Sequence, residues 1–250
     1  MQNHSGRNLT YVIVHDLGRA IVKGHYDQHN PFPIEAALCT QYGASRSVLR
    51  EAVKMLTAKG LLRARPRQGT WIEPEENWNL LDPDVLQWLL ERKYSPQLLV
   101  EFTEMRLAFE PVAAALAAQR CHPEDIQNIL AALDRMREAE KGNDDPLSSD
   151  IAFHVSILNA CGNRFYAQLK GMINTALRIS IRLTNQRKGV PLASIRDHKK
   201  VVDAIIARDP EAASEAMRAL IIEAMMLIQQ SQADELQKAA SIGSSTKSAQ

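Results

Sequence analysis

Residues 44–52 read ASRSVLREA, and this stretch decides how the first third of the chain folds. Continued to Lys59, it has the three-and-four spacing of an amphipathic helix, which Ser45 can cap at its start and Gly60 can end. Three basic side chains fall one turn apart on one side, namely Arg46, Arg50 and Lys54. The roughly opposite side is apolar and carries Val48, Leu49, Ala52, Met55 and Leu56. The sequence therefore predicts a helix that packs with one face and presents cations with the other.

Shorter elements surround this helix in a recognisable order. The spacing of apolar residues predicts a first helix over 11–22 and a short second helix over 35–42. Two strand-like pieces, 61–65 and 70–73, flank the turn formed by Pro66, Arg67, Gln68 and Gly69. Three helices followed by a hairpin predict a winged helix-turn-helix domain, which we expect to span residues 1–74.

Charge is distributed unevenly along the chain, although the total is only +1. Residues 1–74 carry ten Lys or Arg and five Asp or Glu, a net charge of +5, which leaves −4 for residues 75–250. Within residues 44–70 seven basic side chains face a single acidic one, Glu51. Such a basic patch in a small domain is expected of a module that binds a polyanion, although a solvated basic face is the simpler alternative.

The predicted recognition helix and wing supply candidate contacts to DNA. The first turns of a recognition helix enter the major groove, where an arginine can donate two hydrogen bonds to guanine. Serine hydroxyls suit phosphate groups, and a glycine in the wing permits a close approach of the backbone. The candidate contacts are Ser45, Arg46, Ser47, Arg50, Arg67 and Gly69. A solvated charge remains the alternative for any one arginine, but their joint placement favours double-stranded DNA as the partner.

The remainder of the chain is predicted to be helical, which makes the whole protein mostly α. Cap-plus-proline pairs that typically start helices occur at 82–83, 95–96, 122–123, 145–146 and 209–210. We expect six or seven helices after Pro74, arranged as an antiparallel bundle. The expected divisions are a linker and junction helix over 75–95, a helical ligand-binding and dimerisation domain over 96–231, and a flexible tail over 232–250.

Neither a membrane span nor a secretion signal is apparent. No apolar run approaches the roughly 20 residues that cross a bilayer, and the N-terminal segment is polar. The three cysteines, Cys39, Cys121 and Cys161, are widely separated and form no C-x-x-C pair. We therefore expect a cytoplasmic protein with reduced cysteines and no membrane contact.

Four side chains of the helical region have the chemistry of a binding site. Asp150 and His154 are four residues apart on a predicted helix, so both point to one side and can share a divalent cation. His198 and Arg106 are further candidates. From the residues alone, a helix-capping aspartate and a satisfied histidine are the simpler interpretation.

The run 44–52, followed by Leu56, Gly60, Leu61 and the wing glycine, resembles the signature of the GntR family of winged-helix regulators. The resemblance implies that Arg46 and Arg50 are the principal DNA contacts and that Gly69 lies at the wing tip. The chain departs from the pattern after Glu35, where many members have Arg and this sequence has Ala36. The neighbours of the wing glycine, Gln68 and Thr70, also differ, so the resemblance leaves the operator sequence open.

The helical region is similar to the all-helical ligand-binding domain of the fatty-acid-regulator (FCD) branch of this family. The matching residues are Glu104, Met105, Arg106, Glu110, Pro111, Asp150, Phe153, His154, Gly162, Asn163 and His198. The resemblance implies a divalent metal, zinc or similar, on Asp150, His154 and His198, and an effector carboxylate on Arg106. Where the branch has a further histidine this chain has Leu220, which implies weaker metal binding, with a metal-free polar pocket as the alternative.

Residues 78–88, WNLLDPDVLQW, resemble the matching segment of galactonate-operon repressors and related sugar-acid regulators. The resemblance implies a homodimeric repressor that leaves its operator when a small carboxylate effector, a sugar acid, binds at Arg106, Asp150, His154 and His198. One alternative is a metal-dependent hydrolase that uses the last three residues, but it lacks a nucleophile motif and has no use for the basic domain. The other, an architectural DNA-binding protein, leaves Arg106 and the Asp/His set unexplained.

Overall fold

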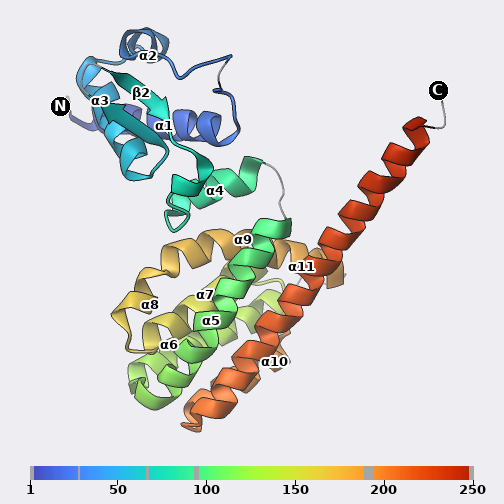
Figure 1. Ribbon diagram of the computed structural model, residues 1–250. Helices are drawn as coiled ribbons and strands as arrows, with labels where there is room; N and C mark the ends of the chain where they lie inside the picture. The colour runs from blue at the N-terminus through green and yellow to red at the C-terminus, as the bar shows by residue number, and fades with distance from the viewer. Residues whose placement is uncertain (1–2, 28, 66–67, 93–95, 189–193, 248–250) are drawn as a thin grey trace. The chain divides into compact units, whose positions relative to one another are not determined.

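The computed structural model forms two compact units, Met1–Tyr94 and Ser95–Gln250 (Figure 1). It describes residues 3–27, 29–65, 68–92, 96–188 and 194–247. Within these residues the chain is mainly helical and the only sheet is a two-stranded hairpin, so the expected mostly α fold is confirmed. None of the described helices is long and apolar enough to cross a membrane.

The first unit contains three helices, a hairpin, a 3₁₀ turn and a fourth helix. These are α1 (Asn3–Val22), α2 (Glu35–Tyr42), α3 (Arg46–Ala58), β1 (Leu62–Arg65), β2 (Gly69–Ile72), η1 (Glu75–Asn77) and α4 (Pro83–Arg92). β1 and β2 pair antiparallel, with Leu62 opposite Ile72 and Arg65 opposite Gly69. This is the predicted winged helix-turn-helix, although α1 begins at Asn3 rather than at Tyr11.

The third helix is built as its sequence pattern predicts. The Ser45 hydroxyl accepts a hydrogen bond from the backbone N–H of Val48 and so caps the helix. Leu49, Ala52 and Leu56 are fully buried, where they pack in the core that α3 shares with α1 and α2. The opposite face of α3 is exposed and keeps its basic side chains in water.

The fourth helix, α4, lies within the first unit. Trp88 is 1% exposed and lies directly over Gly18 of α1, where a Cβ atom would come within 2.3 Å of the indole ring. The Lys59 ammonium group, at the end of α3, donates to the carboxylates of Asp82 and Asp84 at 2.8 Å. Helix α4 is therefore fixed to both α1 and α3.

The second unit contains seven helices within the described residues. These are α5 (Pro96–Arg120), α6 (Pro123–Glu140), α7 (Pro146–Ala160), α8 (Arg164–Gln168), α9 (Lys170–Lys188), α10 (Ile195–Ile206) and α11 (Pro210–Lys247). With α4, the described part of the chain has eight helices after Pro74 instead of six or seven. The additional one, α8, is a single short turn. All five predicted proline starts coincide with the first residue of a helix, because proline needs no N–H partner there.

The two longest helices of this unit, α5 and α11, lie side by side and run antiparallel (Figure 1). The Arg208 guanidinium, just before α11, donates to the carbonyl oxygens of Ala118 and Cys121 at the end of α5. These hydrogen bonds fix the start of α11 beside the end of α5. Beyond residue 231 the backbone continues as helix to Lys247.

Candidate DNA-binding surface and polar core site

The predicted DNA-contacting residues that the structure describes lie on the exposed face of α3 and at the wing. Arg46 and Arg50 are exposed, as is Ser47, whose hydroxyl lies 2.9 Å from that of Ser45. Gly69 has a φ of +105°, which glycine tolerates best, and has open space on the side of a Cβ. The remaining candidate, Arg67, lies outside the described residues.

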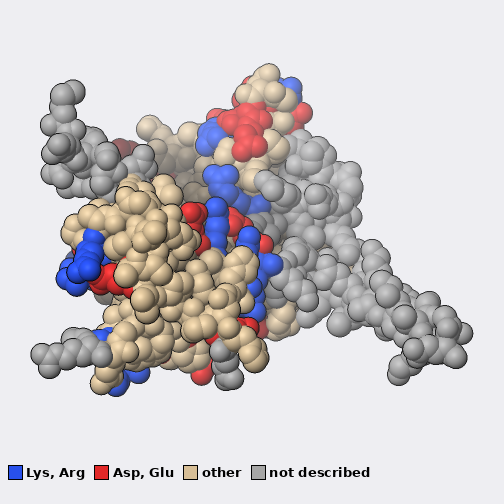
Figure 2. Space-filling model, turned by 90° about the horizontal axis from the view of Figure 1, so that it is seen from above, with Lys and Arg blue, Asp and Glu red and all other residues tan. Residues whose placement is uncertain are grey.

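A groove of about 830 Å³ separates α3 from the wing. Its basic lining residues are Arg50, Lys54 and Arg65, and Phe32, Leu38, Val53 and Ala64 are among its apolar ones. In the face of the molecule shown in Figure 2, patches of Lys and Arg side chains interrupt a mostly uncharged surface, with acidic side chains beside them. Basic side chains of α3 and the wing therefore line the same groove.

Sequence reasoning missed the partner of Arg50. Its Nε donates to Oε2 of Glu35 at 3.1 Å, so the ion pair links the start of α2 to the recognition helix. The two residues are 15 positions apart, and no helical spacing predicts their contact.

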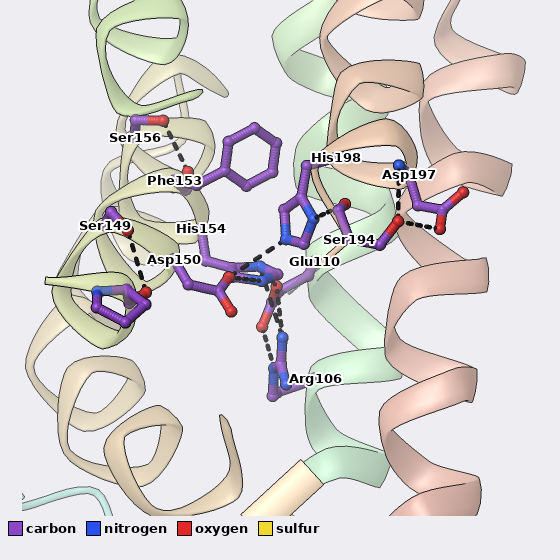
Figure 3. A network of polar contacts seen from close by, with 11 residues as sticks. Arg106, Glu110, Ser149, Asp150, Phe153, His154, Ser156, Ser194, Asp197 and His198 are labelled. Atoms are coloured by element: carbon purple, nitrogen blue, oxygen red, sulfur yellow. Dashed lines mark hydrogen bonds and ion pairs between the residues drawn. The ribbon is translucent and has the colours of Figure 1, made fainter. Parts of the chain in front are cut away.

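The second unit holds a network of five polar side chains (Figure 3). Arg106 and Glu110 come from α5, Asp150 and His154 from α7, and His198 from α10. All five are at most 5% exposed. The structure therefore brings together all four predicted site residues and adds Glu110, which forms a two-point ion pair with Arg106.

Each histidine of the network is held through its Nδ1 atom. His154 Nδ1 lies 2.7 Å from Glu110 Oε2, and His198 Nδ1 lies 2.8 Å from the backbone oxygen of Ser194, which also caps α10. Both acceptors lack a proton, so each Nδ1–H is the donor. The ring of Phe153 packs edge-on against both imidazoles. Each Nε2 atom is thereby left to face the carboxylate of Asp150.

The atoms that face one another fit a divalent cation. Asp150 Oδ1 lies 3.5 Å from His154 Nε2 and 3.2 Å from His198 Nε2. Ligand atoms around tetrahedral zinc are about 3.4 Å apart, given bonds of about 2.0 to 2.2 Å. Each Nδ1–H already donates a hydrogen bond, so the lone pairs of both Nε2 atoms face the carboxylate of Asp150. Favourable contacts then require either a second proton on each imidazole or one divalent cation between the three groups. Carbonyl or carboxylate acceptors behind the imidazoles are typical of metal ligands.

The charges of the network also shift its pKa values. Burial acts to raise the pKa of Glu110, but the charges and hydrogen bonds of Arg106 and His154 outweigh it and lower this pKa to about 2. For Asp150 burial is likewise outweighed, by hydrogen bonds and charge from the two histidines, and its pKa lies well below the ordinary value. Burial acts to lower the pKa of His154, but the charge of Glu110 and hydrogen bonds to both carboxylates raise it.

The structure modifies the expected roles of two further residues. Leu220 packs partly buried against the apolar core of the unit and offers no donor atom, so three protein ligands remain. Arg106 is not a free guanidinium that awaits a ligand, because Glu110 already engages its Nε and Nη2. Within the described chain its Nη1 makes no hydrogen bond.

The two units define a class of protein in which a winged-helix DNA reader is joined to a helical domain with a buried polar site. Residues 9–72 match the model of the bacterial regulatory proteins of the gntR family, and residues 101–223 match the FCD domain. The chain belongs to the GntR family of bacterial transcription regulators and carries an FCD domain, which confirms the resemblance seen in the sequence.

Known relatives are similar over most of their length. The galactonate operon transcriptional repressor of Escherichia coli K12 is 34% identical over 86% of this chain and 94% of its own. The uncharacterised regulator YieP of the same strain is also 34% identical, over 86% and 93%. The structure of Lar, which controls the Listeria monocytogenes agr system, shares the fold at 16% identity with a TM-score of 0.59 and covers 88% and 96%. The matched families are transcription regulators and not enzymes, and nothing supports the hydrolase alternative.

Proposed function

We propose that the protein represses genes for sugar-acid catabolism and leaves its operator when a small carboxylate effector binds the polar core site. Similarity to a galactonate operon repressor supports the sugar-acid class. The observation that carries the proposal is the buried network in which Arg106, Glu110, His154, Asp150 and His198 converge. A fully buried set of ionisable groups is costly to maintain and is expected at a functional site.

Within the first unit, Arg46 and Arg50 are proposed to read bases, and Ser45, Ser47, Arg67 and Gly69 are proposed to contact the phosphate backbone or the minor groove. Their support is the exposed basic face of α3 and the groove beside the wing. Because such a regulator acts on the chromosome, we expect it in the cytoplasm.

In the second unit, Asp150, His154 and His198 are proposed to hold a divalent metal such as zinc, which supplies coordination positions for the effector's carboxylate and a neighbouring hydroxyl. Arg106 stands beside this site, with Nη2 3.5 Å from His154 Nδ1. Its unused Nη1 donates to the same carboxylate. With three protein ligands instead of four, metal binding is expected to be modest.

A second copy of the chain is proposed to dock on the α5–α11 face of the helical unit, so that the regulator is a homodimer. The outer surfaces of these neighbouring helices expose Val112, Ile222 and Met226, with 42%, 38% and 57% of each residue accessible. Exposed apolar side chains gathered on one pair of helices are expected where copies associate. Two linked DNA readers also multiply the specificity of a short half-site.

Isothermal titration of the purified protein with galactonate, gluconate and related acids tests the effector. Binding should occur with zinc present and weaken at least tenfold with chelator, and the bound acid should lower operator affinity reciprocally. The Arg106→Lys variant, which keeps the charge but loses the Nη1 donor and the two-point contact with Glu110, should bind the acid more weakly. A wild type that binds none of these acids would contradict the sugar-acid proposal and leave the DNA-reading role intact.

A further inference from the structure

The ion pair between Glu35 and Arg50 is too exposed to contribute much to the stability of the fold. The Arg50 side chain is 66% exposed and that of Glu35 is 39% exposed. Ion pairs in such surroundings contribute little to the free energy of unfolding, because water and salt screen them. What the contact does change is the orientation of Arg50, whose long side chain would otherwise sample many rotamers.

The geometry of the pair leaves the DNA-reading edge of the arginine open. A guanidinium has five N–H groups in one plane, and Glu35 takes only the one on Nε. Within the described chain, Nη1 and Nη2 of Arg50 make no hydrogen bond. Two parallel N–H groups match O6 and N7 of guanine, and an arginine already held in one plane loses less conformational entropy when it docks.

The carboxylate of Glu35 lies where a negative charge opposes DNA binding. Glu35 lines the same groove as Arg50, with Arg65 and Gly69 of the wing also in its lining. A negative charge in a surface that receives phosphates weakens the binding of every DNA sequence. Because the carboxylate weakens DNA binding and adds little to stability, its contact with Arg50 is the effect that explains its position.

We propose that Glu35 is a positioning residue that determines sequence specificity. It aligns Arg50 for two hydrogen bonds to one base pair, while its charge weakens the binding of every DNA sequence. This inference rests on the proposed DNA-reading role of the first unit. It assigns selectivity to a residue of α2 that itself makes no base contact.

The test compares Glu35→Ala, Glu35→Gln and the matched control Glu51→Gln. Glu51 pairs with Lys54 at 3.5 Å on the same recognition helix, so its substitution also removes one acidic charge next to a cation. The probes are a duplex selected from a random library by the wild-type full chain, its single-base-pair variants, and a scrambled duplex. Affinities are measured by fluorescence anisotropy at several salt concentrations, and thermal melting checks that each variant is folded.

All three variants should bind the scrambled duplex more tightly than the wild type. Only Glu35→Ala should lower the ratio of specific to non-specific affinity by about tenfold, the scale of one bidentate base contact. The loss should be confined to the base pair at which Arg50→Ala also loses discrimination. Glu35→Gln, which keeps an acceptor for Nε, should retain most of this discrimination, and Glu51→Gln all of it.

In an Arg50→Ala background, Glu35→Ala should remove no further discrimination, because the two residues act as a unit. A wild type that selects no sequence would overturn the DNA-reading role itself. A selective wild type whose ratio changes less than twofold in Glu35→Ala, or a loss that persists without Arg50, would overturn the positioning role alone.

Discussion

Oε2 of Glu110 lies 2.7 Å from Nδ1 of His154 and joins the ion pair on α5 to the histidine on α7. Through this one atom, Arg106 on one side and Asp150 on the other belong to a single network. Glu110 is thus placed to orient His154 and to fix its tautomer, which leaves Nε2 for a metal.

Replacement of Glu110 by Gln should lower the affinity for zinc about tenfold to a hundredfold, as is usual when a partner behind a ligating imidazole is lost. Isothermal titration with zinc measures the change. Glu104→Gln is the matched control, because Glu104 lies exposed on the same helix. If the wild type and Glu110→Gln bound zinc with equal affinity, Glu110 would have no role in metal binding.

The same network predicts how stability depends on pH in the absence of metal. The pKa of Glu110 is lowered to about 2, so its contribution is present above its ordinary value of 4.5 and is lost as the pH falls toward 2. The pKa of His154 is raised, so its contribution is present below 6.5 and is lost as the pH rises through the raised value.

Urea unfolding with chelator, from pH 3 to pH 9, measures both losses. The free energy of unfolding of the wild type should fall on the acid side more than that of Glu110→Gln. On the alkaline side the wild type should also lose stability, and saturating zinc should counteract that loss because the metal binds the deprotonated imidazole. A pH profile that is identical in wild type and Glu110→Gln would contradict the assignment of these charges.

Arg46→Ala and Arg50→Ala should each lower operator affinity by about 1 to 3 kcal/mol while the fold is retained, because both side chains are exposed and leave no cavity. Lys54→Ala should weaken specific and scrambled duplexes about equally and reduce the salt dependence, as expected for a phosphate contact. Gel shift at fixed salt separates the two behaviours. If both arginine variants bound the operator with wild-type affinity, α3 would not be the recognition helix.

The fold could be predicted from the sequence because its signals are local. The Ser45 cap, the apolar face of α3 and the prolines that begin α4, α5, α6, α7 and α11 act within a few residues. α8 was missed since five residues carry too little periodicity. Asp150 and His154 are one helical turn apart, so their proximity could also be predicted from the sequence.

Side-chain contacts between different helices could not be predicted from local sequence patterns. The pairs formed by Glu110 with His154 and by Glu35 with Arg50 join residues 44 and 15 positions apart, and each depends on how two helices pack. The contact of Trp88 with Gly18 likewise joins α4 to α1, and no local pattern indicates that this glycine makes room for the indole ring. Buried polar partners become predictable only once the packing of the helices is known.

The α5–α11 face gives a direct test of dimer formation. Ile222→Glu and Met226→Glu should each raise the dimer dissociation constant by at least about tenfold, because a two-fold interface buries each introduced charge twice. Sedimentation of the full chain measures this constant. Phe165→Glu is the matched control, since Phe165 is 77% exposed but lies on α8. If Phe165→Glu dissociates the dimer while Ile222→Glu does not, the copies meet on a surface that includes α8, and the α5–α11 assignment is wrong.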